Sequence, residues 1–84
     1  MALNEFVSGT LAVGAQNTIW YQRNNYQDAG IQIAMANPKN PGARLLIVDQ
    51  GKEMRTGGLI VYWVTFKNIG GYATNYTVSA GGVV

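Results

Sequence analysis

Residues that could carry acid–base or nucleophilic chemistry are scarce in this sequence. Its 84 residues include no histidine and no cysteine, which removes the commonest general base and the thiolate nucleophile. The remaining candidates are four carboxylates: Glu5, Asp28, Asp49 and Glu53. A carboxylate pair can cleave a glycosidic bond, but Glu53 stands between Lys52 and Arg55 in a charged turn, where solvation explains it. We therefore expect no catalytic residue and no enzyme activity.

One polar loop has the residue types of a weak calcium site. The segment "NNYQD" offers oxygen donors from Asn24, Asn25 and Asp28. Calcium takes six to eight oxygen ligands, usually including several carboxylates, and this loop has one acid. Turn formation explains the same residues. We predict no metal and no cofactor.

The aromatic residues are the stronger candidates for a binding surface. Trp20 and Trp63 each alternate out of phase with the more apolar face of their own expected strand, so the two indoles should meet on one outer surface. Indoles suit a surface that is wet when free and dry when bound. Sugars stack their C–H faces on such rings, while amides meet the hydroxyl groups. The sequence predicts a lectin-like, carbohydrate-binding rim made of Trp20, Gln22, Asn24, Asn25, Tyr26 and Trp63.

The segment "LIVYWVTFKN" is apolar on both faces of the strand that it predicts. Leu59, Val61 and Trp63 form its second face, where a sheet with one wet side would carry polar residues. Monomers seldom expose contiguous apolar patches larger than a few hundred Å². These three residues therefore predict a homo-oligomer interface, and a structural subunit of a homo-oligomeric assembly is the alternative function. Closure into a barrel, or a loop crossing the sheet, would instead cover the patch from within the chain.

The elements that position these residues are all expected to be strands, because glycine or proline interrupts nearly every window and the clear apolar period is two. The sequence predicts one all-β domain spanning residues 1–84, a small antiparallel sandwich or partly closed barrel of about six strands. The expected strands run from Phe6 to Leu11, Asn17 to Gln22, Ile31 to Ala36, Arg44 to Gln50, Leu59 to Asn68 and Tyr72 to Ala80. Gly14 marks the first turn, and "GKEMRTGG", residues 51–58, is expected to be a charged hairpin loop. The alternation predicts a core of Ile31, Ile33, Met35, Ile60, Tyr62, Val64, Phe66, Tyr76 and Val78, with Tyr72 also facing inward.

Two short stretches resemble bacterial Ig-like modules of adhesion and accessory proteins. "VTFKNIGGYATNYTV" is similar to their strand–Asn-x-Gly–strand hairpin, and "GTLAVGAQNTIWY" is similar to their L-x-x-G turn. Together they cover about a third of the chain, in the reverse of the usual order. The resemblance implies an Ig-like sandwich and a binding or adhesion role, and it assigns no site residue.

Composition excludes several other classes of partner. The net charge is +2, and the six basic residues form no run, so we expect no nucleic-acid partner. No apolar stretch reaches 18 residues, so we expect no membrane span. The opening "MALNEFVSG" lacks the charged and apolar regions of a Sec signal. We expect a soluble protein, cytoplasmic or exported by a non-Sec route, that associates with itself because 84 residues form only a marginal core.

Overall fold

The computed structural model describes residues 4–82, and for residues 4–6 it describes the backbone alone. The described chain forms antiparallel strands and a single turn of 3-10 helix, which confirms the expected all-β class. The elements are β1 (Asn4–Leu11), β2 (Gln16–Tyr21), η1 (Asn24–Tyr26), β3 (Gln32–Pro38), β4 (Leu45–Arg55), β5 (Leu59–Asn68) and β6 (Thr74–Gly82).

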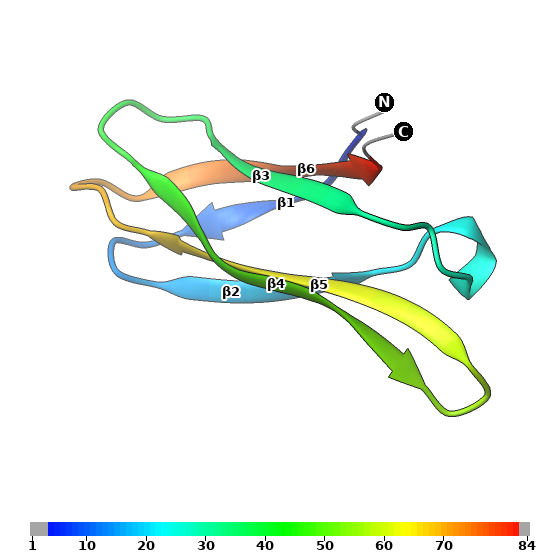
Figure 1. Cartoon of the computed structure of the whole chain (residues 1–84). Coiled ribbons are helices and arrows are strands. Elements are labelled where there is room, and N and C mark those ends of the chain that lie inside the picture. Colours follow the sequence, from blue (N-terminus) through cyan, green and yellow to red (C-terminus); the bar gives the residue numbers. More distant parts are fainter. Residues whose placement is uncertain (1–3, 83–84) are drawn as a thin grey trace.

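The strands form two separate three-stranded sheets that face each other as a sandwich (Figure 1). The first sheet has the order β1-β6-β3 and the second has the order β2-β5-β4. Only β4 and β5 are joined as a hairpin within one sheet, and the other connections cross between the sheets. The first crossing is the turn after β1, where Gly14 has a φ of 78° as its expected turn position requires. The two sheets do not join into a closed barrel.

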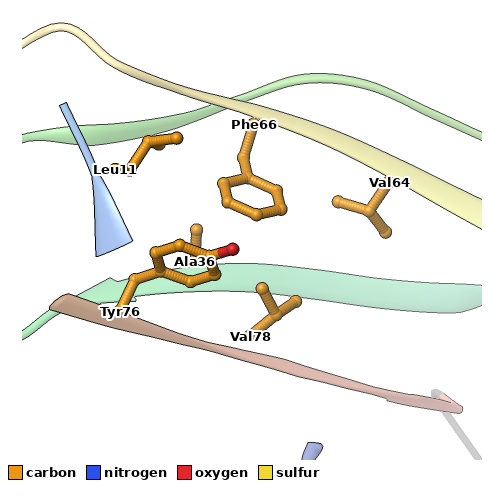
Figure 2. Packing of buried hydrophobic residues seen from close by; sticks show 6 residues of the cluster. All are labelled: Leu11, Ala36, Val64, Phe66, Tyr76 and Val78. Carbon is orange, nitrogen blue, oxygen red and sulfur yellow. The ribbon is translucent and has the colours of Figure 1, made fainter. Parts of the chain in front are cut away.

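The core lies between the central strands β5 and β6. Figure 2 shows the rings of Phe66 and Tyr76 between the two sheets, with their centroids 4.9 Å apart and an edge-on geometry. Phe66 and Val78 are completely buried. The expected core positions on these two strands are confirmed as buried: Ile60, Tyr62, Val64, Phe66, Tyr76 and Val78.

The expected facing of β3 is wrong. Ile31, Ile33 and Met35 are 75%, 37% and 60% exposed, whereas Ala36 is buried. Pairing with β6 places Ala36 opposite Val78, which turns the alanine face of β3 inward. The opposite facing would also bury Asn37, whose amide instead donates to Thr77 and Ser79 on the outer surface. Burying that amide without partners would cost about 1–3 kcal/mol, which opposes the alternative facing.

Two segments near strand ends also differ from the sequence-based expectation. Tyr72 is 68% exposed, because β6 begins only at Thr74. The buried Asn68 amide holds the preceding loop by donating to the Leu11 and Tyr72 carbonyl oxygens. The expected loop of residues 51–58 is also wrong, since β4 continues to Arg55. Figure 1 shows the β4–β5 hairpin continuing past the end of β3. The charged side chains of Lys52 and Arg55 are exposed on this part of β4.

Candidate functional site

The two tryptophans meet on the outer face of the second sheet, as predicted. β2 pairs with β5 so that Trp20 lies directly opposite Trp63. Their ring centroids are 5.8 Å apart and the ring planes are tilted by 44°. Trp20 is half exposed, and Trp63 is partly buried. The pair therefore forms an aromatic platform that still faces solvent.

A glycine in β4 makes room for the Trp63 ring. Gly51 lies opposite Trp63 in the β4–β5 pairing. A Cβ atom at Gly51 would overlap the six-membered ring of the indole. Trp63 therefore lies flat across the neighbouring strand, which explains how a tryptophan in the middle of a three-stranded sheet remains close to its surface.

An arginine from the hairpin end of β4 covers part of the platform. The Arg55 guanidinium carbon lies 5.1 Å from the centroid of the Trp20 ring, a distance at which a cation and an aromatic face attract. Arg55 Nε also donates to Glu53 Oε2 at 2.7 Å. Both charged side chains are about half exposed, so this contact holds Arg55 above the indole without burying it.

Beside Trp20 the surface forms a hollow of about 210 Å³, called here the η1 hollow. Its lining is Trp20, Tyr21, Gln22, Tyr26, Arg55 and Val61. Three of the six residues expected to bind a ligand, Trp20, Gln22 and Tyr26, thus come together around one depression. Trp63 joins them through its contact with Trp20. Asn24 and Asn25 are exposed in η1 but do not line the hollow, and their role in binding stays a prediction.

The backbone of η1 has an unusual conformation. Asn24, Asn25 and Tyr26 have φ values of 49°, 58° and 65°. Asparagine tolerates this left-handed region, but a bulky tyrosine adopts it at some cost. The Gln22 side-chain oxygen accepts a hydrogen bond from the Tyr26 backbone N–H at 3.1 Å and holds the turn against β2. Residues held in such conformations often belong to binding sites. No local sequence pattern predicted the left-handed conformation of all three residues.

The three residues expected at an oligomer interface differ in exposure. Leu59 is 46% exposed, whereas Val61 is only 4% exposed and lies in the η1 hollow. Part of the second face of β5 is therefore covered by the same chain. Leu59 and the Trp63 ring remain at the surface, and the interface through Leu59, Val61 and Trp63 stays a prediction.

A second depression opens between the sheets and was not foreseen. This inter-sheet pocket has a volume of about 390 Å³. Its walls are formed by Tyr21, Asp28, Gly30, Ile31, Gln32, Gln50, Gly51, Lys52, Tyr62 and Trp63. The Gln32 Oε1 atom in its wall is buried and has no hydrogen-bond partner among the described residues.

An ion pair marks the mouth of the inter-sheet pocket. Lys52 Nζ lies 2.8 Å from Asp28 Oδ1, which also accepts the Gly30 backbone N–H. The Tyr62 hydroxyl accepts the Ala29 N–H at 2.9 Å and so anchors the same loop. The hydrogen bond from Lys52, assisted by the one from Gly30, lowers the pKa of Asp28, and Asp28 in turn raises the pKa of Lys52. The residues lie 24 positions apart, so sequence reasoning had no local signal for this pair.

Two stacked tyrosines form the inner wall of this pocket. The Tyr21 and Tyr62 rings lie 5.4 Å apart at an angle of 23°. Burial raises the pKa of Tyr21, and this effect outweighs the opposing attraction of Arg23. The Tyr21 phenol therefore stays neutral at physiological pH and presents a hydrogen-bonding group without charge.

Within residues 4–82, no three aspartate or glutamate side chains are grouped closely enough to hold a metal ion. The Glu5 side chain lies outside the described residues. In the same part of the chain, no helix has the length and apolarity needed to cross a bilayer. Comparison of the chain with protein-family models, with curated proteins and with solved structures finds no match in any of the three.

Proposed function

We propose that this protein is a non-catalytic recognition module that binds carbohydrate on the aromatic surface formed by Trp20, Tyr26 and Trp63. The observation that carries the proposal is the solvent-facing Trp20–Trp63 pair, with ring centroids 5.8 Å apart, on a regular sheet. Such a platform is ordered before the ligand arrives, so binding costs little side-chain entropy. A pyranose ring would stack its C–H face on the indoles.

Polar groups around the platform suit a neutral ligand with many hydroxyl groups. Gln22 and Arg55 line the η1 hollow, and Asn24 and Asn25 are exposed in the adjacent turn. Amides both donate and accept hydrogen bonds, as hydroxyl groups require. The Arg55 charge is balanced by Glu53 at 2.7 Å, so the surface has no strong preference for a charged ligand.

The absence of a catalytic role is supported by the state of the carboxylates near these depressions. Asp28 is bound to Lys52, and Glu53 is bound to Arg55. The hydrogen bond from the Lys52 ammonium lowers the pKa of Asp28 and makes it a poorer general acid or base near neutral pH. Recognition through stacking and hydrogen bonding needs neither group to transfer a proton.

Tryptophan fluorescence provides the test. A glycan array identifies binding sugars, and titration of the best sugar should shift the emission of the wild-type protein. Trp20→Ala should weaken binding about tenfold or more, the equivalent of ~1.4 kcal/mol for one lost stacking contact. Tyr72→Ala is the matched control, because it removes an exposed aromatic ring from the loop at the opposite end of the sandwich. Equal affinity of Trp20→Ala and wild-type protein would refute the assignment.

We also propose that the chain associates with itself, and a structural subunit of a homo-oligomer is the second candidate function. The supporting observation is that large apolar side chains are exposed on several strands, including Leu59 at 46% and Met35 at 60%. Where such side chains gather into a contiguous patch of several hundred Å², they mark an interaction surface. Light scattering after size exclusion gives the mass. Trp63→Ser should dissociate the oligomer if Leu59 and Trp63 form its interface, and should only weaken sugar binding if they do not.

A further inference from the structure

The outer surface of β3 carries an exposed apolar stripe. Ile31 immediately precedes β3, and Ile33 and Met35 project from it on the side away from the core, at 75%, 37% and 60% exposure. β3 is the edge strand of the first sheet and pairs only with β6 among the described residues. One side of its backbone is thus open to a further strand.

β3 lacks the devices that usually prevent edge strands from pairing. Natural edges carry charges, bulges or an internal proline. β4 has a bulge between Ile47 and Asp49 and several charged residues, and β1 has a bulge between Glu5 and Val7. β3, with the sequence QIAMANP, has neither a charge nor a bulge, and its proline stands at its last position. Its neighbours on the outer face of β6 are also neutral, namely Thr77, Ser79 and Gly81.

The remaining edge strand, β2, is uncharged as well but differs in what it exposes. Its outward apolar side chain, Trp20, is partly covered by the Arg55 guanidinium at 5.1 Å. Its outward Thr18 hydroxyl shares a hydrogen bond of 2.7 Å with Thr65. An added strand at β2 would therefore meet a polar and charged surface, whereas at β3 it would meet isoleucine and methionine.

We propose that β3 pairs in antiparallel fashion with β3 of a second copy of this chain, joining the two first sheets into one six-stranded sheet. An isologous contact requires one patch to be complementary to itself, and this stripe meets that condition. In the register that places Ile33 opposite Ile33 of the second copy, Ile31 lies opposite Met35 of that copy. Met35 likewise lies opposite Ile31 of that copy. The outward Ile33 pair and the flanking Ile31–Met35 pairs are then apolar, and no like charges face each other.

The surface beside the stripe offers a hollow as well as protruding side chains, and a self-complementary contact needs both. A small hollow of about 90 Å³ is lined by Ile33, Ala34, Met35 and Ser79. It can receive an apolar side chain from the second copy, while Ile31 and Met35 protrude. A two-fold joint closes on itself and gives a dimer, because each copy uses its one open β3 edge. The inference rests on the proposed self-association but not on carbohydrate binding, because the aromatic surface lies on the other sheet.

Single cysteine variants test this joint directly, because the natural sequence has no cysteine. Ile33→Cys should form a covalent dimer under mild oxidation in native buffer, since the two residues would be directly opposed across the two-fold axis. Ser79→Cys, on the same face but one strand further in, should stay monomeric on a non-reducing gel. Thr18→Cys, on the β2 edge, should also stay monomeric. Cross-linking of Thr18→Cys in place of Ile33→Cys would overturn the assignment to β3.

A substitution that introduces a charge into the stripe provides the second test. Met35→Lys should raise the dimer dissociation constant at least tenfold, because two lysines would be desolvated in the joint. Met54→Lys is the matched control, since Met54 is exposed on the charged β4 strand and its replacement should leave the mass unchanged. Both variants should keep the far-ultraviolet circular dichroism spectrum of the wild type and its response to sugar.

The outcomes separate the inference from the proposals on which it stands. A wild-type monomer at every concentration refutes both self-association and the β3 joint. A wild-type dimer that persists in Met35→Lys, without cross-linking of Ile33→Cys, refutes the β3 joint alone. Loss of sugar binding in Trp20→Ala with an unchanged dimer supports recognition and leaves the β3 joint intact.

Discussion

Substituting Gly51 by alanine should disturb the aromatic surface while leaving the fold in place. The added Cβ would overlap the ring of Trp63, and the ring has to move because the backbones of β4 and β5 are held by their pairing from Leu45 to Arg55. Trp63 is only partly buried, so its indole can swing toward solvent. We expect the contact between Trp63 and Trp20 to be lost.

Two opposing contributions determine the effect on stability. Loss of the indole contact costs about 0.5–1.5 kcal/mol. Replacing a glycine within a strand recovers roughly 0.5–1 kcal/mol, because alanine loses less backbone entropy on folding. The free energy of unfolding should therefore change by less than about 1 kcal/mol, whereas the tryptophan signals and the affinity for sugar change strongly.

Urea unfolding followed by far-ultraviolet circular dichroism measures the stability, and near-ultraviolet dichroism with fluorescence reports on the indoles. Gly71→Ala is the matched control, because a Cβ at Gly71 meets no atom within 4 Å. Identical tryptophan spectra for Gly51→Ala and wild type would refute the placement of Trp63 over Gly51. A loss of stability above about 3 kcal/mol would show that the strand pairing, and not the ring, gives way.

Three further predictions concern the core, a loop and a surface ion pair. Phe66→Ala should destabilise the fold by about 3–5 kcal/mol in urea unfolding, because Phe66 is fully buried; a loss below about 1 kcal/mol would contradict the packing in Figure 2. Asn68→Ala should cost about 1–3 kcal/mol by leaving the Leu11 carbonyl without its donor, and unchanged stability would show that water replaces the amide. The folded pKa of Asp28 lies below the ordinary aspartate value of 3.8, so its pairing with Lys52 stabilises the fold above about pH 4, and this stabilisation is lost as the pH falls through the folded pKa. Carboxyl NMR titration should show the pKa of Asp28 rising toward its ordinary value in Lys52→Met, and no rise would refute the pairing.

The exposed stripe also sets the strength expected of a β3 dimer. Ile31, Ile33 and Met35 are 75%, 37% and 60% exposed. At ~1.5–3 kcal/mol per fully buried side chain, weighted by these exposed fractions, covering the three residues on both copies gains roughly 5–10 kcal/mol. Association itself costs an estimated 4–15 kcal/mol, so this gain and the new backbone hydrogen bonds have to overcome a comparable loss. Mass measurements should therefore extend over a wide concentration range, because a weak dimer dissociates on dilution.

Local alternation was sufficient to predict the two central strands and the aromatic platform. In β5 one face carries Tyr62, Val64 and Phe66, and Trp63 falls between them, so its outward position follows from the period of two. The same reasoning placed Trp20 outward in β2, and the antiparallel register brought the two rings together. The complete absence of histidine and cysteine likewise restricted the available chemistry before any fold was known.

The facing of β3 was decided only by its neighbours. Isoleucine and methionine alternate with alanine there, so both faces are apolar and local periodicity cannot choose between them. The register with β6 makes the choice, because it places Ala36 opposite Val78 and gives the Asn37 amide partners on Thr77 and Ser79 some 40 residues away. Tertiary pairing thus exposed the larger side chains and produced the stripe on which the β3 joint depends.

Local sequence patterns also could not predict the contacts around the η1 hollow and the inter-sheet pocket. Asp28 meets Lys52 because the loop before β3 folds over the end of β4, and the ring of Trp63 stays near the surface because Gly51 comes opposite it. The sequence by itself determined which residues alternate along each strand, since that depends on the backbone of one segment. The tertiary structure decided which face is covered and which side chains meet, since these depend on the register between segments far apart in the chain.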